Sequence, residues 1–185
     1  SDFQSACHGD KPMKNKKLPT TPKNGFTLTE LLISVSIIGI LGSVSIPQYF
    51  HQLQKTRQNE AAAALSHIQT TIAAFVEEVG LLPQSWKDLN TISPLMAPTG
   101  AANKPNFSAI TLASSGCTAN NPLNCYQVEA KEEEYVFTLH AKPLHTDVAT
   151  YNVLACLDLK TGASDIRKGN HKSEAKVDQL NCQNN

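Results

Sequence analysis

The chain has 185 residues, of which 41% are apolar, with 16 basic and 16 acidic side chains. This length suffices for one modest domain with a hydrophobic core, and the apolar fraction excludes a disordered polymer. The charge is neutral overall but unevenly distributed: residues 13–25 carry four lysines and no acid, whereas residues 26–185 carry 11 basic and 14 acidic side chains. This split predicts export of the acidic part of the chain, while the short basic N-terminal segment stays inside the cell.

The apolar residues are concentrated near the N-terminus. Residues 26–46 form a run of 21 residues in which Glu30 is the only charged side chain. As a helix this run would span about 31 Å, close to the hydrocarbon core of a bilayer, which is about 30 Å thick. Gly39 and Gly42 lie inside it, and a helix in lipid tolerates them. We therefore predict a transmembrane and polymerisation helix that ends at Pro47.

A second helical pattern follows without a linker. Apolar residues in 48–79 recur at spacings of three and four, with charged and amide side chains between them, which is typical of an amphipathic helix. Gly80 and the nearby Pro83 are stop signals. We predict one continuous helix over residues 26–79, in which Pro47 bends or loosens the junction of the two halves.

The remainder, residues 80–185, is predicted to form a globular head. Residues 80–124 contain five prolines and resemble a long ordered loop with short elements near 86–92 and 109–113. Strand-like stretches then recur at 126–130, 135–141 and 151–157, separated by turn-like stretches at 131–134 and 142–149.

The connections between these strands are too short for parallel crossovers, so we predict an antiparallel meander. The fold class is therefore α+β, with a long N-terminal helix packed on three or four antiparallel strands. We assign no structure to the polar tail, residues 163–185.

The junction between the basic N-terminal segment and the apolar run carries the most specific motif, which is Lys23-Asn24-Gly25-Phe26-Thr27-Leu28-Thr29-Glu30. A Gly-Phe-Thr-Leu-x-Glu sequence after a lysine-rich leader closely resembles the class III signal of type IV pilins and type II secretion pseudopilins. The resemblance implies cleavage by a prepilin peptidase between Gly25 and Phe26, followed by N-methylation of Phe26. Pro47 also falls where these proteins usually have a proline.

Residues 1–25 would then be the leader. Met13 is the only methionine before the apolar run, and a start there gives a leader of the usual family length. We therefore treat residues 1–12 as upstream sequence or as a misassigned start.

Two other interpretations of the apolar run are open. A conventional secretory signal would be cleaved after the run, where Ser43-Val44-Ser45 is a candidate, and a plain single-span anchor would not be cleaved. Both leave Glu30 unexplained, because an isolated acid in lipid costs roughly 2.5–3.5 kcal/mol or more.

Cleavage after Gly25 provides Glu30 with a partner. It creates an α-ammonium group on Phe26, which lies four positions before Glu30 and therefore on the same helix face. In a packed bundle the carboxylate could instead meet the amine of a neighbouring subunit and set the stagger between subunits, and the resemblance favours this version.

The glycines and the proline suggest where the helix yields. We predict that the stretch from about Gly39 through Gly42 to Pro47 loses regular helix in the assembled filament, because two glycines and a proline make it the least costly part to unwind.

The chain has five cysteines, and five is an awkward number for a secreted protein. Removal of the leader removes Cys7 and leaves four, which is typical of a disulfide framework in a small exported domain. Of the three pairings, we favour Cys117–Cys125 and Cys156–Cys182, the latter like the C-terminal disulfide-bounded loop of many pilins. Cys117–Cys156 with Cys125–Cys182 is the alternative.

The resemblance implies a structural subunit rather than an enzyme, present in the inner membrane as a precursor and in an extracellular pilus filament after assembly. Such a fibre serves motility, adhesion or DNA uptake. The implied partners are copies of the chain itself, the prepilin peptidase, the assembly platform protein and the assembly ATPases. We find no catalytic, cofactor or metal signature in the sequence.

Two alternative functions are kept. One is a minor pilin or a type II secretion pseudopilin. The other is a membrane-anchored binding module, for which DNA is a weak candidate partner because a basic cluster lies in the tail: Arg167, Lys168, His171, Lys172 and Lys176.

Overall fold

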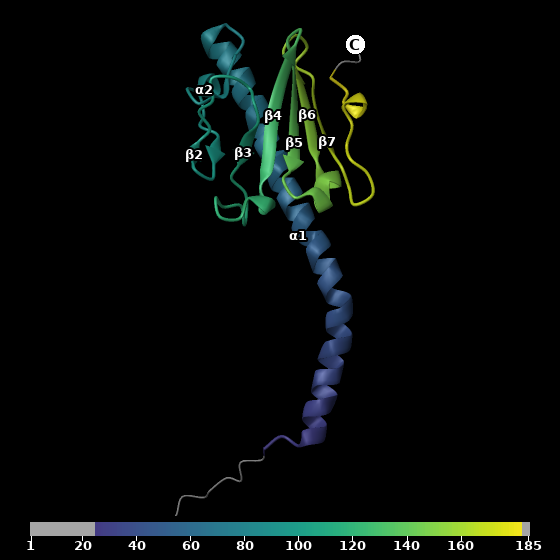
Figure 1. Ribbon diagram of the computed structural model, residues 1–185. Helices are drawn as coiled ribbons and strands as arrows, with labels where there is room; N and C mark the ends of the chain where they lie inside the picture. Colours follow the sequence, from purple (N-terminus) through teal and green to yellow (C-terminus); the bar gives the residue numbers. More distant parts are fainter. Residues whose placement is uncertain (1–24, 183–185) are drawn as a thin grey trace, which may run out of the picture. The chain divides into compact units, whose positions relative to one another are not determined.

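A computed structural model describes residues 25–182 (Figure 1). The chain divides into two units, one that ends at Gly42 and one that begins at Ser43, and each is described here by itself. Most of the predicted leader, including Cys7, Met13 and the basic residues, lies outside the described residues.

Helix α1 runs from Leu28 to Val79 and has 52 residues, so the predicted continuous helix is confirmed to within two residues at its start. It ends as its stop signals indicate. Gly80 adopts a left-handed conformation with φ +73°, and its N–H donates to Val76 O at 2.9 Å, which is how a C-terminal glycine satisfies a last-turn carbonyl.

The head contains a five-stranded sheet in the order β3-β4-β5-β6-β7, with every neighbouring pair antiparallel. The predicted meander is confirmed, with five strands in place of three or four. The strands are β3 (Ile110–Leu112), β4 (Tyr126–Glu133), β5 (Val136–Pro143), β6 (Val153–Asp158) and β7 (Ser164–Lys168).

Shorter elements surround this sheet. Ahead of it lie helix α2 (Trp86–Leu89) and a small hairpin of β1 (Met96–Ala97) and β2 (Gly100–Ala101). Single 3-10 turns form η1 (Pro122–Asn124) and η3 (Val177–Gln179), and η2 (Thr146–Tyr151) is a pair of 3-10 turns with a kink at Val148.

The turn predicted at residues 131–134 is wrong in position. Strand β4 continues to Glu133, which pairs with Val136, so the loop is only Glu134 and Tyr135. Both loop residues have positive φ, 52° and 74°, as a two-residue hairpin turn that follows the twist of its strands requires. The run of glutamates at 132–134 is typical of a turn in sequence. In the structure, alternate side chains of β4 face solvent, so the end of the strand can carry charged residues.

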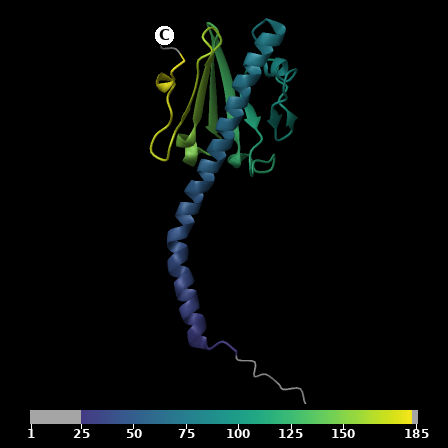
Figure 2. The same ribbon diagram turned by 180° about the vertical axis from the view of Figure 1, so that it is seen from behind.

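One face of the sheet packs on α1. Figure 2 shows the helix from this side, and the helix residues in contact have the spacing of one stripe. The buried stripe on α1 consists of Ala61, Ala62, Leu65, Ile68, Ile72 and Phe75, and the facing sheet residues are Tyr126, Val128, Phe137, Leu139, Ala141, Val153, Ala155 and Leu157.

Two buried amides on α1 fix the helix to the far strands of the sheet. Gln58 Nε2 donates to the carbonyl oxygens of Asn152 at 3.2 Å and Gly169 at 2.8 Å, and Gln69 Nε2 donates to Cys156 O at 2.6 Å. These hydrogen bonds specify the position of the helix, because the carbonyl groups lie opposite both amides in only one register of helix against sheet. They therefore orient a contact that apolar packing alone would leave free to slide.

The polar tail that the sequence left unassigned covers the other face of β6. Side chains alternate along a strand, so Leu154 and Cys156 face away from α1, yet both are buried, against Ala175, Leu180 and Cys182 of the tail. The tail also supplies β7, and it lies beside β7 in both views (Figures 1 and 2). Strand β6 is consequently buried on both faces.

Candidate functional site: the N-terminal helix and its junction

The predicted cleavage junction lies just before α1. Gly25 is exposed, and the Phe26 side chain is 88% exposed. Helix α1 starts two residues later, at Leu28. The bond between Gly25 and Phe26 thus lies in non-helical, exposed backbone, a condition that a peptidase requires of its substrate.

Glu30 has a partner within its own chain that the sequence analysis missed. Its Oε2 accepts from the backbone N–H of Thr27 at 2.8 Å and from the Thr27 hydroxyl at 2.8 Å, while the Glu30 N–H donates to Thr27 Oγ1 at 3.2 Å. This reciprocal arrangement is a capping box, which satisfies backbone donors at the start of a helix. The Thr-x-x-Glu spacing of residues 27–30 was the signal that could have found it.

The first part of α1 is apolar on every side. Its large side chains between Leu28 and Leu41 are 52–78% exposed: Leu28, Leu31, Leu32, Ile33, Val35, Ile37, Ile38, Ile40 and Leu41. A helix that is apolar all round is normally covered by lipid or by other helices. Among the described residues, α1 is the one helix long and apolar enough to cross a membrane.

Small residues interrupt this apolar surface. The Ser34 and Ser36 hydroxyls donate to the carbonyl oxygens of Glu30 and Leu32 within the same helix, at 2.7 and 2.8 Å, so they need no partner in lipid. No atom lies within 4 Å of a Cβ built on Gly39 or Gly42. These positions leave room for the close approach of another helix.

Helix α1 continues without a break through Gly39, Gly42 and Pro47. The expected loss of regular helix there concerns the assembled filament, so it stays a prediction.

Four cysteines in the head form two disulfides, Cys117–Cys125 and Cys156–Cys182, which are the favoured pairs. The first closes the loop that leads into β4. Glu60 on α1 also holds this loop, because its Oε2 accepts from Ser115 N at 2.8 Å. The second joins the outward face of β6 to the tail.

Only some of the side chains of the predicted basic cluster contact the same surface of the head. Lys168 on β7 donates to Asn59 Oδ1 of α1 at 2.9 Å, and the His171 ring lies 6.1 Å from the His51 ring, centroid to centroid. The Arg167 guanidinium is instead paired with Asp165 on the same strand, at 2.9 Å. The α1 side chains near this surface, Asn59 and His51, are more than 100 residues away in the chain, so the sequence pattern of the tail does not reveal them.

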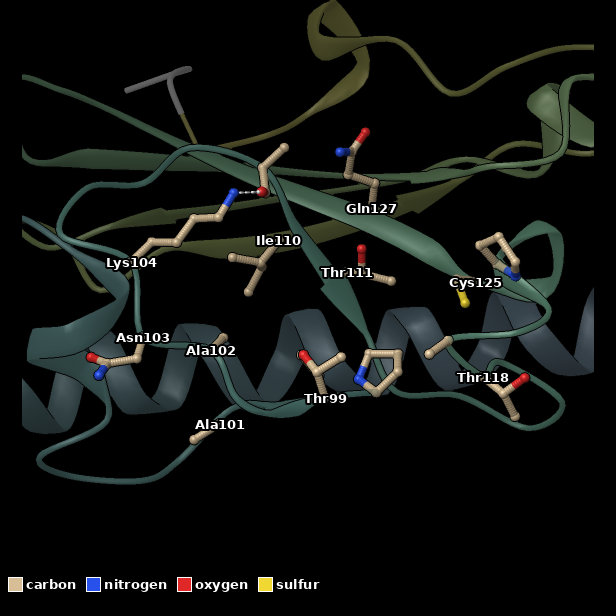
Figure 3. A pocket seen from close by; sticks show the side chains of 15 residues that line it. Thr99, Ala101, Ala102, Asn103, Lys104, Ile110, Thr111, Thr118, Cys125 and Gln127 are labelled. Carbon is tan, nitrogen blue, oxygen red and sulfur yellow. Dashed lines mark hydrogen bonds between the residues drawn. The ribbon is translucent and has the colours of Figure 1, made fainter.

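A pocket of about 430 Å³ lies outside the edge strand β3, under the β1–β2 hairpin (Figure 3). Its lining consists of small apolar, hydroxyl and amide side chains. The one charged group, the Lys104 ammonium, donates to Ala109 O, and Cys125 is held in a disulfide. The residues that line this pocket include no carboxylate, imidazole or free thiol.

Two titratable groups in the head are perturbed by burial. Burial raises the pKa of Tyr126, whose hydroxyl donates to Tyr151 O at 2.9 Å. Burial lowers the pKa of His140, with a contribution from Lys142. Both side chains take part in structural hydrogen bonds. Within residues 25–182 no three His, Cys, Asp or Glu side chains are grouped so as to hold a metal ion.

Comparison with known proteins finds a family model on this N-terminal region and a relative that spans most of the chain. The family model described as the prokaryotic N-terminal methylation motif matches residues 21–46. The type IV major fimbrial protein FimA of Dichelobacter nodosus is 30% identical over 156 residues, which cover 79% of this chain and 97% of the relative.

Other matches are shorter. The type IV major pilin protein PilA of Myxococcus xanthus (strain DK1622) is 41% identical over 58 residues, and a fimbrial protein of Pseudomonas aeruginosa is 39% identical over 56 residues. These matches cover 31% and 30% of this chain, and only 26% and 36% of those two proteins. No solved structure matches the chain.

Proposed function

This chain belongs to the type IV pilin family, and we propose that it is a structural subunit of a type IV pilus. The observation that carries the proposal is the first part of α1, which presents an apolar surface on every side directly after the junction of Gly25 and Phe26. A monomeric soluble protein rarely exposes such a surface. Bilayer lipid would cover it in the precursor, and neighbouring copies of the same helix would cover it in the fibre.

In this proposal the prepilin peptidase removes the leader after Gly25, and Phe26 becomes an N-methylated terminus. The subunit then passes from the inner membrane into an extracellular filament with the help of an assembly platform and ATPases. The match to FimA, which covers 79% of this chain, favours a major subunit over a minor pilin or a pseudopilin. A structural role requires no cofactor.

Glu30 can serve both the helix cap and an intersubunit ion pair. Both of its side-chain hydrogen bonds to Thr27 use Oε2, so among the described contacts Oε1 is left for a cation. We propose that this cation is the Phe26 α-ammonium of a neighbouring subunit. The pair would neutralise two charges that are each costly in an apolar environment.

N-terminal sequencing of fibres sheared from cells tests the proposal. We expect an abundant band that starts at N-methylated Phe26 and contains no leader. A low-abundance band with the same start would indicate a minor pilin. A chain that is never found in fibres would overturn the structural role and leave the membrane-anchored binding module. A start directly after Ser45 would indicate a conventional secretory signal.

A further inference from the structure

The end of the head at which α1 enters carries a belt of exposed apolar and aromatic side chains. Val44, Ile46, Tyr49 and Phe50 are 57–67% exposed, and the rings of Tyr49 and Phe50 contact each other edge to face at 6.1 Å. Val44 and Ile46 end the apolar run, and Tyr49 and Phe50 directly follow it in sequence. Tyrosine rings prefer the level of the lipid headgroups, where one end of the ring is apolar and the other is wet.

Basic and histidine side chains surround the helix directly beyond this belt. On α1 they are His51 and Lys55, one turn apart. The His51 ring lies 6.1 Å from the His171 ring, and His51 Nδ1 lies 3.2 Å from the Tyr151 hydroxyl. These contacts place the loop after β7 at the level of the helix turn that follows the aromatic pair.

Two more lysines, Lys168 and Lys172, come from that part of the chain, and the first contacts α1 about two turns beyond His51. Lys168, the last residue of β7, reaches Asn59 of the helix, and Lys172 is next to His171 in sequence. Both lysines are exposed. Lys55, Lys168 and Lys172 therefore lie around one end of the head, although they come from two distant parts of the chain.

Buried contacts hold this loop in place. The Asn152 side chain is 2% exposed and forms a pair of hydrogen bonds with the backbone of Ala175, at 2.8 and 2.9 Å. Gln58 of α1 donates to Gly169 O, and a Cβ on Gly169 would collide with Thr150 O. The basic side chains thus project from a fixed backbone, which reduces the entropy lost when they bind.

The opposite end of the head is acidic, although the whole chain is neutral. Glu77 and Glu78 lie in the last turn of α1, and Glu133 and Glu134 lie at the β4–β5 turn, where they line one surface pocket with Asp158 and Lys160. Lys131 pairs with Glu133, so the acids at this end outnumber the lysines. Acids near the basic end are Glu60, next to Asn59 on α1, Asp147 in η2 and Glu174 in the tail. An anionic surface would therefore attract one end of the head and repel the other.

We propose that, before assembly, the end of the head that carries Lys55, Lys168 and Lys172 lies against anionic lipid headgroups at the surface of the membrane. This proposal rests on the proposed membrane anchorage of the precursor. The adjacent aromatic belt favours lipid over nucleic acid as the partner, because duplex DNA offers phosphates but no apolar layer beside them. Headgroup contact would hold the waiting subunit in one orientation, and release of these contacts would accompany its entry into the fibre.

Hydrogen exchange on the full chain in lipid nanodiscs tests this inference. The chain is compared in phosphatidylcholine nanodiscs and in nanodiscs of equal parts phosphatidylcholine and phosphatidylglycerol. We expect amide exchange at residues 170–172 to slow by about fivefold or more in the anionic nanodiscs at low salt, and the difference to disappear at high salt. The double variant Lys168→Glu, Lys172→Glu should abolish the difference.

Lys87→Glu is the matched control, because it changes the same charge on α2, which follows the other end of α1, and it should leave the protection intact. Inorganic phosphate added to phosphatidylcholine nanodiscs should give no protection. Equal exchange in both lipids would overturn the proposal, as would stronger protection by duplex DNA than by anionic lipid. A chain that fails to enter either nanodisc would instead contradict the proposed anchorage.

Discussion

Two stretches of the same helix carry large apolar side chains in opposite environments. Between Ala61 and Phe75, the large apolar residues of α1 form one stripe and are 0–8% exposed, because the sheet covers them. Between Leu28 and Leu41 they lie on all sides and are more than half exposed. The comparison separates two uses of apolar surface: the stripe holds the head together, and the uniformly apolar stretch requires a partner outside the chain.

The largest expected effect concerns the one charge in the uniformly apolar stretch. Glu30→Gln keeps an acceptor for the Thr27 N–H, because glutamine also completes a capping box, but it removes the negative charge. The Phe26 α-ammonium of a neighbouring subunit would then lack its counter-ion. We expect filament yield to fall by about tenfold or more, measured as sheared fibre relative to total subunit in the membrane.

Thr27→Val is the matched control, because it removes the capping hydroxyl but leaves the charge. A helix cap contributes about 1 kcal/mol, so filament yield should change little. If Thr27→Val lowers the yield as much as Glu30→Gln, Glu30 acts through the cap and the intersubunit pair is wrong.

A leucine taken from each stretch tests the comparison directly. Leu65 is fully buried in the core, so Leu65→Ala should lower the free energy of unfolding of the head by about 2–5 kcal/mol. Leu32 is 58% exposed, and Leu32→Ala should change it by less than about 0.5 kcal/mol. Thermal unfolding of both variants in detergent micelles measures the difference, and equal losses would show that the head depends on the apolar stretch.

The pattern of apolar residues was enough to predict α1. Its first stretch is a continuous apolar run, its second stretch has apolar residues three and four positions apart, and Gly80 marks its end. The same reasoning predicted the antiparallel meander from strand length and connection length. It misplaced the β4–β5 turn by two residues, because Lys131, Glu132 and Glu133 resemble a loop and yet alternate correctly along a strand that is exposed on one face.

Two features could not be predicted from the sequence, because they depend on contacts between residues that are distant in the chain. Strand β7 has a weak pattern of its own, and it is recognised only by its pairing with β6 and by the tail that covers Leu154 and Cys156. The basic end of the head likewise combines Lys55 of α1 with residues more than 100 positions away. The Glu30 capping box, in contrast, was visible in the spacing and was missed because the acid was considered only as a charge in lipid.

The two disulfides extend the comparison to the C-terminal half. Cys156–Cys182 spans 26 residues and Cys117–Cys125 spans eight, so chain entropy predicts losses of about 3.5 and 2.5 kcal/mol when each pair is replaced by alanine. Thermal unfolding of the two double variants gives the order. Mass mapping of non-reduced peptides checks the pairing itself, and a Cys117–Cys156 peptide would contradict it.

A smaller effect is expected from the amides of α1. Gln69→Ala removes a buried donor and leaves Cys156 O without it, which should cost about 1–3 kcal/mol of head stability. Gln52 has an exposed side chain on the same helix, and Gln52→Ala should be close to neutral. A neutral result for Gln69→Ala in thermal unfolding would show that apolar packing alone sets the position of the helix on the sheet.

The smallest effect concerns His140. Its polar partner, Asn152, lies within the chain, whereas the cation proposed for Glu30 belongs to a neighbouring subunit. Asn152 Nδ2 can only donate, so at 3.3 Å His140 Nε2 must accept and carry no proton. The groups that act on the imidazole are Lys142, which opposes its protonation, and Glu129 and Glu174, which favour it, while burial is the largest influence and lowers the pKa.

A histidine whose pKa is lowered in the folded state binds fewer protons there than in the unfolded chain. Its contribution to stability is therefore complete above its ordinary value of about 6.5 and declines as the pH falls below that value. We expect the melting temperature of the wild-type chain to drop between about pH 7.5 and about pH 5 by more than that of His140→Gln, which cannot gain a proton. Parallel pH profiles for the two chains would mean that Glu129 and Glu174 accommodate the charged imidazole and that the Asn152 contact is dispensable.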